Sequence, residues 1–184
     1  GLGADTPRKF DLRASIGYFS EFRSVYLPLY GALALFAMGI SAATGWGAVL
    51  LTRSFGYTIG AAGKALGSGQ ILWAIAGAAL ASVLVDLVAR RAGPVGKVYL
   101  AGALALSAIP AGLAVFAPSG PLAVVLLAEI MGVSALYGTC MLSVFAEITP
   151  VRVRGLSVAL YAFVMTLIGG SLGPIAVAFL TETV

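Results

Sequence analysis

One acidic residue, Glu129, lies inside a long apolar segment of this 184-residue chain. At about 1.5 Å of rise per helical residue, it stands roughly 10 Å from the nearer end of that segment. A carboxyl group at that depth in a bilayer is costly unless it is paired, protonated or in contact with water. Two interpretations follow: a site that couples protons or binds a substrate ammonium group, and a structural hydrogen bond to a neighbouring helix.

A second group of charged residues, Asp86 with Arg90 and Arg91, lies between two apolar segments, where we expect a loop. An acid and paired arginines at a membrane face can bond to carbonyl groups or acids on adjacent helices. The group therefore predicts a conformational latch, and simple anchoring of the arginines at the cytoplasmic face is the alternative. Anchoring is the better explanation for a similar group further along the chain: Glu147, Arg152 and Arg154.

Three further residues are candidates for contact with a substrate. Arg53 lies at the end of the first apolar segment, where it could pair with Glu129 or bind an anionic head group. An arginine that extends its guanidinium to the interface is equally ordinary. Gln70 and Tyr137 lie within apolar segments and could line a cavity, although most such groups bond to their own helix backbone.

The composition identifies an integral membrane protein. Apolar residues make up 60% of the chain, charged residues 10%, and the mean hydropathy is +1.04. A soluble domain of this length has too much surface to hide so many apolar side chains. The apolar segments are long and continuous, which favours helices over the short alternating strands of a membrane barrel. The predicted fold is therefore all-α, with the lipid bilayer as its first partner.

Several kinds of chemistry are excluded by the residues present. The chain has no histidine and one cysteine, Cys140, so histidine triads, histidine metal sites and an internal disulfide are absent. With one intramembrane acid the inventory is too poor for an enzyme, and we expect no catalytic residue, cofactor or metal. The basic residues behind the net charge of +4 stand at segment ends, so nucleic-acid binding is not expected.

Five segments reach the roughly 20 apolar residues that a membrane span needs: about 26–51, 58–85, 98–116, 122–145 and 155–180. Lysine and arginine gather on alternate flanks, and only Arg53 and Lys64 fall on the opposite set. This charge excess places the N-terminus in the cytoplasm. Residues 1–25 then form a cytoplasmic linker with an amphipathic helix on the membrane surface, or alternatively a disordered linker. The alanine- and glycine-rich composition with short loops favours a bacterial inner membrane.

Glycine and proline mark places where the helices could pack closely or bend. Two glycine pairs are spaced four residues apart, Gly63–Gly67 and Gly169–Gly173, which lets helix backbones approach. Pro110 in the third span and Gly173–Pro174 in the fifth are the predicted kinks. Close packing and bending during alternating access remain alternative explanations for these positions.

The charged group at Asp86 is part of a longer pattern. Residues 82–91 resemble the G-x-L-x-D-R-x-G-R-R signature between the second and third helices of a half in the major facilitator superfamily. Four positions match the signature: Leu84, Asp86, Arg90 and Arg91. Three positions depart from it: Ser82, Leu87 and Ala89. This degraded form is typical of the second half of such a transporter.

Two other stretches resemble a subgroup of that superfamily, the spinster-like transporters. Residues 46–53, from Trp46 to Arg53, resemble the end of their seventh helix, with Ala48 in place of a proline. Residues 150–155, 157–161 and 169–174 resemble their eleventh helix and the loop before it. Together with residues 82–91, these stretches spread the resemblance over most of the chain.

The resemblance implies that the five spans correspond to helices seven to eleven of a twelve-helix transporter. The linker at 1–25 would be the central cytoplasmic linker, and the partners would be the missing six-helix half and a twelfth helix after Val184. The implied function is secondary transport, by alternating access, of a small organic solute or a lysolipid-like amphiphile. Coupling of this transport to protons is one expectation. The alternative is a non-transporting membrane scaffold or receptor of helical-bundle type.

Overall fold

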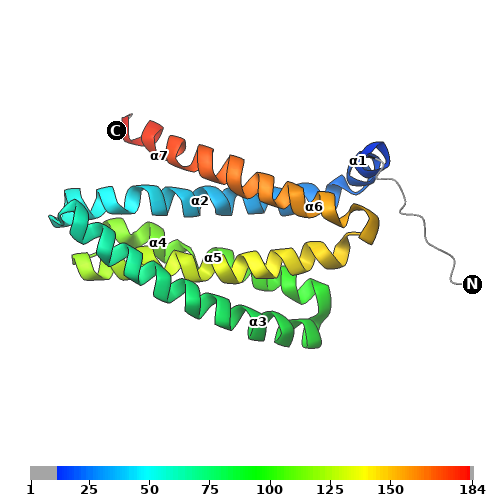
Figure 1. The fold of residues 1–184 in the computed structure, drawn as a ribbon, viewed down its shortest axis with the longest axis horizontal. Helices are drawn as coiled ribbons and strands as arrows, with labels where there is room; N and C mark the ends of the chain where they lie inside the picture. The colour runs from blue at the N-terminus through cyan, green and yellow to red at the C-terminus, as the bar shows by residue number, and fades with distance from the viewer. Residues whose placement is uncertain (1–11, 183–184) are drawn as a thin grey trace, which may run out of the picture.

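The computed structural model describes residues 12–182, and the elements in this range are all helical (Figure 1). The first eleven residues of the predicted linker lie outside the described range. In chain order the elements are α1 (Leu12–Glu21), α2 (Arg23–Phe55), α3 (Ile59–Leu106), α4 (Ile109–Leu113), η1 (Ala114–Phe116), α5 (Gly120–Ile148), α6 (Val151–Phe163), η2 (Val164–Leu172) and α7 (Gly173–Glu182).

Four helical stretches among the described residues are long and apolar enough to cross a membrane: Arg23–Phe55, Ile59–Phe116, Gly120–Ile148 and Val151–Phe179. These stretches make the chain an all-α protein of the helical membrane class. The second stretch has 58 residues, which at about 1.5 Å per residue is far longer than a hydrocarbon core of roughly 30 Å. A helix of that length has to be interrupted or bent.

The interruption in α3 lies at Gly93, and the loop expected around Asp86 is absent. The helix continues through Asp86, Arg90 and Arg91. The predicted span 58–85 therefore ends too early, and the predicted span 98–116 begins too late. Gly93 alone leaves helical geometry, with φ 60° and ψ −155°, a region open almost only to glycine. Pro94 follows, and its fixed φ suits the first turn of a new helix. In Figure 1 the chain reverses here, so α3 is a hairpin of two arms.

Both arms of α3 pack against α5. On the first arm, Gly77 meets the backbone of Gly132, and a methyl group added at Gly132 would lie 2.7 Å from the carbonyl oxygen of Trp73. These glycines allow the two backbones to approach closely. The predicted contact at Gly63–Gly67 does not form, because a methyl group at either residue would have no described atom within 4 Å.

The bundle has two different ends, which Figure 1 shows at right and left. The α1 end contains α1, the Gly93 turn of α3 and the turn between α5 and α6. The Arg53 end contains the turn between α2 and α3 and the beginning of α5. Each end has its own buried cluster, with Tyr26, Tyr137 and Phe145 in the larger one and Leu51 and Leu127 in the smaller one.

The three proposed kink residues lie at helix junctions. Pro110 is the second residue of α4, which begins after the break at Ser107 and Ala108. Gly173 and Pro174 begin α7, directly after the π-helical segment η2. Of the predicted glycine pairs, Gly169–Gly173 does make a helix contact. A methyl group at Gly169 would lie 3.0 Å from the carbonyl carbon of Ala37, and one at Gly173 would lie 3.0 Å from Cβ of Ser41.

Candidate functional site

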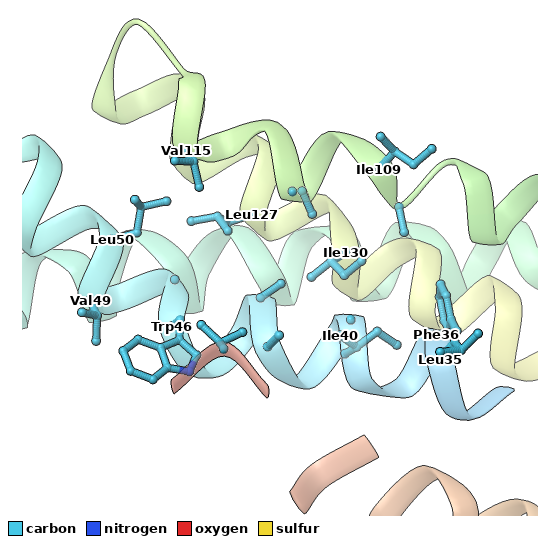
Figure 2. Close-up of a pocket in the computed structure, with 18 of the residues that line it drawn as sticks. Leu35, Phe36, Ile40, Trp46, Val49, Leu50, Ile109, Val115, Leu127 and Ile130 are labelled. Carbon is cyan, nitrogen blue, oxygen red and sulfur yellow. The ribbon is translucent and has the colours of Figure 1, made fainter. Parts of the chain in front are cut away.

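A groove of about 650 Å³ lies between α2, α4 and α5, with Val177 of α7 at its side. Figure 2 shows the side chains around this groove, among them Trp46, Leu50 and Val115. Its α2 wall runs from Leu35 to Ser54, which is about 28 Å at the helical rise of 1.5 Å per residue. Because the walls are almost wholly apolar, the groove suits an apolar chain or helix rather than a polar solute.

The charged group of the groove lies in the last turn of α2. Arg53 is exposed there, next to Ser54. A guanidinium is a fixed positive charge with five N–H donors, and it can hold a phosphate or carboxylate with two hydrogen bonds. The groove therefore has an apolar body and one cationic end.

Glu129 does not face this groove. The α5 residues in its wall are Leu127 and Ile130, and Glu129 is rotated from Ile130 by about 100° around the helix axis. Glu129 is half-buried, and its Oε1 atom is buried without a hydrogen-bond partner among the described residues. The expected pair with Arg53 therefore does not form, and the two candidates belong to separate sites.

The two other cavity candidates lie in packed regions. Tyr137 is buried, and its ring centroid lies 3.9 Å from that of Phe36 on α2. Gln70 is half-buried on α3, directly after Gly69, where the first arm meets Ala128 of α5. Neither residue is in the wall of the groove.

The residues of the proposed latch lie together on the first arm of α3, near its turn. Asp86, Arg90 and Arg91 are all exposed, and within the described part of the chain no ion pair joins them to another residue. Asp86 and Arg90 line a small surface hollow of about 270 Å³ with Val83 and Leu87. In this conformation the three residues hold no neighbouring helix.

An ion pair between the buried Lys97 and the exposed Glu147, near the same turn, was not predicted. Lys97 is 4% exposed, and its Nζ atom pairs with Oε1 of Glu147 and donates to Oγ of Ser143 at 2.6 Å. The thiol of Cys140 donates to the carbonyl oxygen of Lys97 at 3.1 Å. Among the described residues the ion pair of Glu147 is with Lys97, and no ion pair joins Glu147 to Arg152 or Arg154.

The sequence does hold a signal for this pair. Cys140, Ser143 and Glu147 are spaced three and four residues apart, so they share one face of α5. The residue facing them could not be chosen, because Lys97 was expected in a loop on the cytoplasmic flank. The single-residue turn at Gly93 instead places Lys97 inside the second arm of α3.

A chain of hydroxyl groups joins four elements at the α1 end, and we call it the tyrosine network: Tyr18, Tyr26, Tyr30, Thr149 and Ser157. Tyr26 Oη lies 2.9 Å from Thr149 Oγ1, which donates to Ser157 Oγ at 3.4 Å. Tyr30 donates to the carbonyl oxygen of Ser157 at 2.9 Å, and Tyr18 donates to that of Ile148 at 3.4 Å.

The tyrosine network fixes α1 to the bundle. Thr149 and Ser157 are almost wholly buried, and the rings of Tyr18 and Phe19 contact Tyr26. Burial, followed by the hydrogen bond to Tyr26, raises the pKa of Tyr18 to about 12. Tyr18 therefore keeps its proton, and remains a hydrogen-bond donor, at a pH where a free tyrosine would ionise. Only the spacing of Tyr26 and Tyr30, four residues apart on one helix face, hinted at this network.

The described residues hold no group of three or more acidic, cysteine or histidine side chains that could bind a metal ion. Comparison of the chain with protein-family models, with curated proteins and with solved structures gives no match. The interpretation of the groove therefore depends on its own geometry.

Proposed function

We propose that this chain is part of a secondary transporter that moves a small organic solute or a lysolipid-like amphiphile by alternating access. The observation that supports this proposal is the groove of about 650 Å³ with Arg53 at one end. Ligand cavities in proteins typically measure about 300–1,000 Å³ and have mostly apolar walls with a few polar groups. A single acyl chain fits the apolar walls, and the guanidinium of Arg53 pairs with an anionic head group.

The proposed topology has five crossings of a bacterial inner membrane. The N-terminus and the Gly93 turn lie on its cytoplasmic side. The two arms of α3 count as separate crossings because they run in opposite directions against α5. The resemblance to helices seven to eleven of a major facilitator transporter of the spinster-like subgroup supports this count. It also supplies the proposed partners, which are a first six-helix half and a twelfth helix.

Single cysteines test this topology in the full-length protein, with Cys140 replaced by serine. A cysteine at Ala92, beside the Gly93 turn, should react with a membrane-impermeant maleimide only from the cytoplasmic side. A cysteine at Ser119, in the turn before α5, should react only from the opposite side. Both positions are exposed. Labelling of both from one side would contradict five crossings.

The substrate site can be tested with a fluorescent anionic lysophospholipid in proteoliposomes. Arg53→Met should lower uptake at least tenfold, because the substitution removes the only cation in the groove wall among the described residues. Lys64→Met is the matched control, since Lys64 is an exposed cation on α3 outside the groove. Equal uptake by Arg53→Met and the unaltered protein would contradict the assignment of the groove.

Proton coupling is proposed for Glu129, whose buried Oε1 atom has no described partner. A carboxyl group in this environment is free to exchange a proton during the cycle. Glu129→Gln should abolish the dependence of flux on the pH gradient and leave the protein folded. Unchanged pH dependence in this variant would show that Glu129 has a structural role.

A membrane scaffold or receptor is the second candidate, and the small residues of the groove favour it. Its walls include eight glycine and alanine residues: Gly39, Ala42, Ala43, Gly47, Ala105, Ala108, Ala111 and Gly112. Small residues let helix backbones approach, and the 28 Å of α2 along the groove is close to the bilayer core of about 30 Å. In a scaffold, Ala42→Phe should release a bound transmembrane helix, and the lysophospholipid should not be transported by any variant.

A further inference from the structure

The last membrane stretch contains an unusual helical segment. Residues 164–172, η2, form a π-helix between α6 and α7. A π-helix bonds each N–H to the carbonyl five residues earlier. Such helices are rare, and those within α-helices are mostly single turns, which frequently lie at functional sites. Gly169 and Gly170 lie inside η2, and Gly173 and Pro174 follow it. This composition lowers the cost of changing the backbone, because glycine tolerates many conformations and proline removes one donor.

The helices on either side of η2 are held in different ways. On the α6 side, Ser157 is wholly buried and accepts hydrogen bonds from Tyr30 and Thr149. On the α7 side, Gly173 and Pro174 contact α2 through apolar and backbone atoms. Hydrogen bonds fix one geometry, whereas contacts between small residues and backbone allow neighbouring helices to slide.

We propose that η2 is a register hinge, which converts between π-helical and α-helical turns and thereby rotates α7 against a fixed α6. A π-helical turn holds about one residue more than an α-helical turn. Conversion of one such turn to α-helix therefore shifts the helical register of all residues after it by one residue. One residue corresponds to about 100° of rotation and 1.5 Å of translation along the helix. The conversion moves the glycine face of α7 away from Ser41 and Gly45 of α2, which it now contacts.

The proposed motion is large enough to measure. With a helix radius of about 5 Å, a rotation of 100° moves the end of a side chain by roughly 8 Å. Spin labels at Leu27 on α2 and Ile175 on α7 report this motion, since both positions are mostly exposed. A second pair, Leu27 and Val158, reports α6 as the internal control. The full-length protein is labelled in lipid nanodiscs with Cys140 replaced by serine.

The expected result is two populations of the Leu27–Ile175 distance and one population of the Leu27–Val158 distance. A single population for both pairs would overturn the hinge. Two populations for both pairs would also overturn it, because α6 would then move together with α7. This comparison needs no change in η2, so it stands even if a variant of η2 does not fold.

A one-residue deletion tests the register mechanism itself. Removing Gly170 takes out the extra residue of the wider turn, so the Leu27–Ile175 distance should collapse to one population. Gly170→Ala is the matched control, because its methyl group meets no described atom within 4 Å and the chain length is kept. The control should retain both populations. A deletion variant that keeps both populations would overturn the register mechanism. The test concerns only helix geometry, so its outcome is independent of the proposed transport.

Discussion

The α1 end and the Arg53 end of the bundle are built from different interactions. At the α1 end, the tyrosine network and the pair between Lys97 and Glu147 connect α1, α2, α3, α5 and α6 through polar groups. At the Arg53 end, the cluster around Leu51 and Leu127 is apolar, and the groove lies beside it. One end therefore has directional bonds between helices, and the other has contacts that depend mainly on shape.

This difference has a physical consequence in a membrane. Lipid chains are as apolar as leucine, so apolar contacts between helices gain little from leaving the solvent, and packing decides their strength. Hydrogen bonds and ion pairs are strong in the same environment because the dielectric constant is low. The α1 end is accordingly expected to keep one geometry, while helices at the Arg53 end can separate or admit a ligand.

Among the polar contacts, removing the acid that pairs with the buried Lys97 should have the largest effect on stability. Glu147→Ala leaves the nearly buried amine of Lys97 without its counter-charge, which we expect to lower the free energy of unfolding by about 3 kcal/mol. This is the low end of the range for buried pairs, because the Glu147 side chain is 40% exposed. Unfolding in SDS measures the effect.

Two variants control this experiment. Asp86→Ala removes an exposed acid without an ion pair among the described residues, so its free energy of unfolding should change by less than about 0.5 kcal/mol. Lys97→Met combined with Glu147→Leu should recover most of the loss, because an apolar pair leaves no buried charge. If Glu147→Ala and Asp86→Ala cost the same, the polar bonds do not distinguish the α1 end.

The same ion pair shows where prediction from sequence succeeds and fails. Hydropathy predicted an all-helical membrane protein, because long apolar runs leave few other folds. It predicted a longer loop between residues 85 and 98, whereas the structure reverses direction at Gly93 alone and leaves the polar residues around it helical. Lys97 then appeared to flank a loop, although it lies inside a helix and faces α5.

The candidate site was harder to predict because it depends on helix rotation. A pair between Arg53 and Glu129 was one of the alternatives that the sequence left open, yet Leu127 and Ile130 face the groove with Arg53. A shift of one residue around α5 changes which side chain faces α2. The spacing of residues within one helix does not determine which face of that helix packs against which neighbouring helix. The groove is therefore defined only by the assembled bundle.

Removing one hydroxyl from the tyrosine network should have a smaller effect. Tyr26→Phe keeps the ring but loses the contact with Thr149 Oγ1 at 2.9 Å, which we expect to lower the free energy of unfolding by about 1 kcal/mol. Tyr99→Phe is the control, because Tyr99 is 76% exposed on α3. A loss of equal size in both variants would mean that the network adds nothing beyond ordinary side-chain contacts.

The pH dependence of stability should carry a signal from Tyr18. Its pKa is about 12 in the folded protein, above the usual value of about 10 for an unfolded tyrosine. Between pH 10 and 12 the unfolded state has lost this proton and the folded state keeps it, so the free energy of unfolding falls as pH rises. Comparing stability at pH 9.5 and 11.5 should give a shallower fall for Tyr18→Phe. An identical slope would mean that α1 is not docked through Tyr18.

The smallest effect is expected at the Arg53 end. Val115 lines the groove and is 60% exposed, so Val115→Ala removes few contacts and should change the free energy of unfolding by less than about 0.5 kcal/mol. Leu33→Ala, at a wholly buried position in the larger cluster, should cost about 2–5 kcal/mol and shows that the assay responds to lost packing. If Val115→Ala instead costs as much as Tyr26→Phe, the groove is filled in the intact protein. The Arg53 end would then be as firmly packed as the α1 end, and a bound helix or lipid chain would supply the missing contacts.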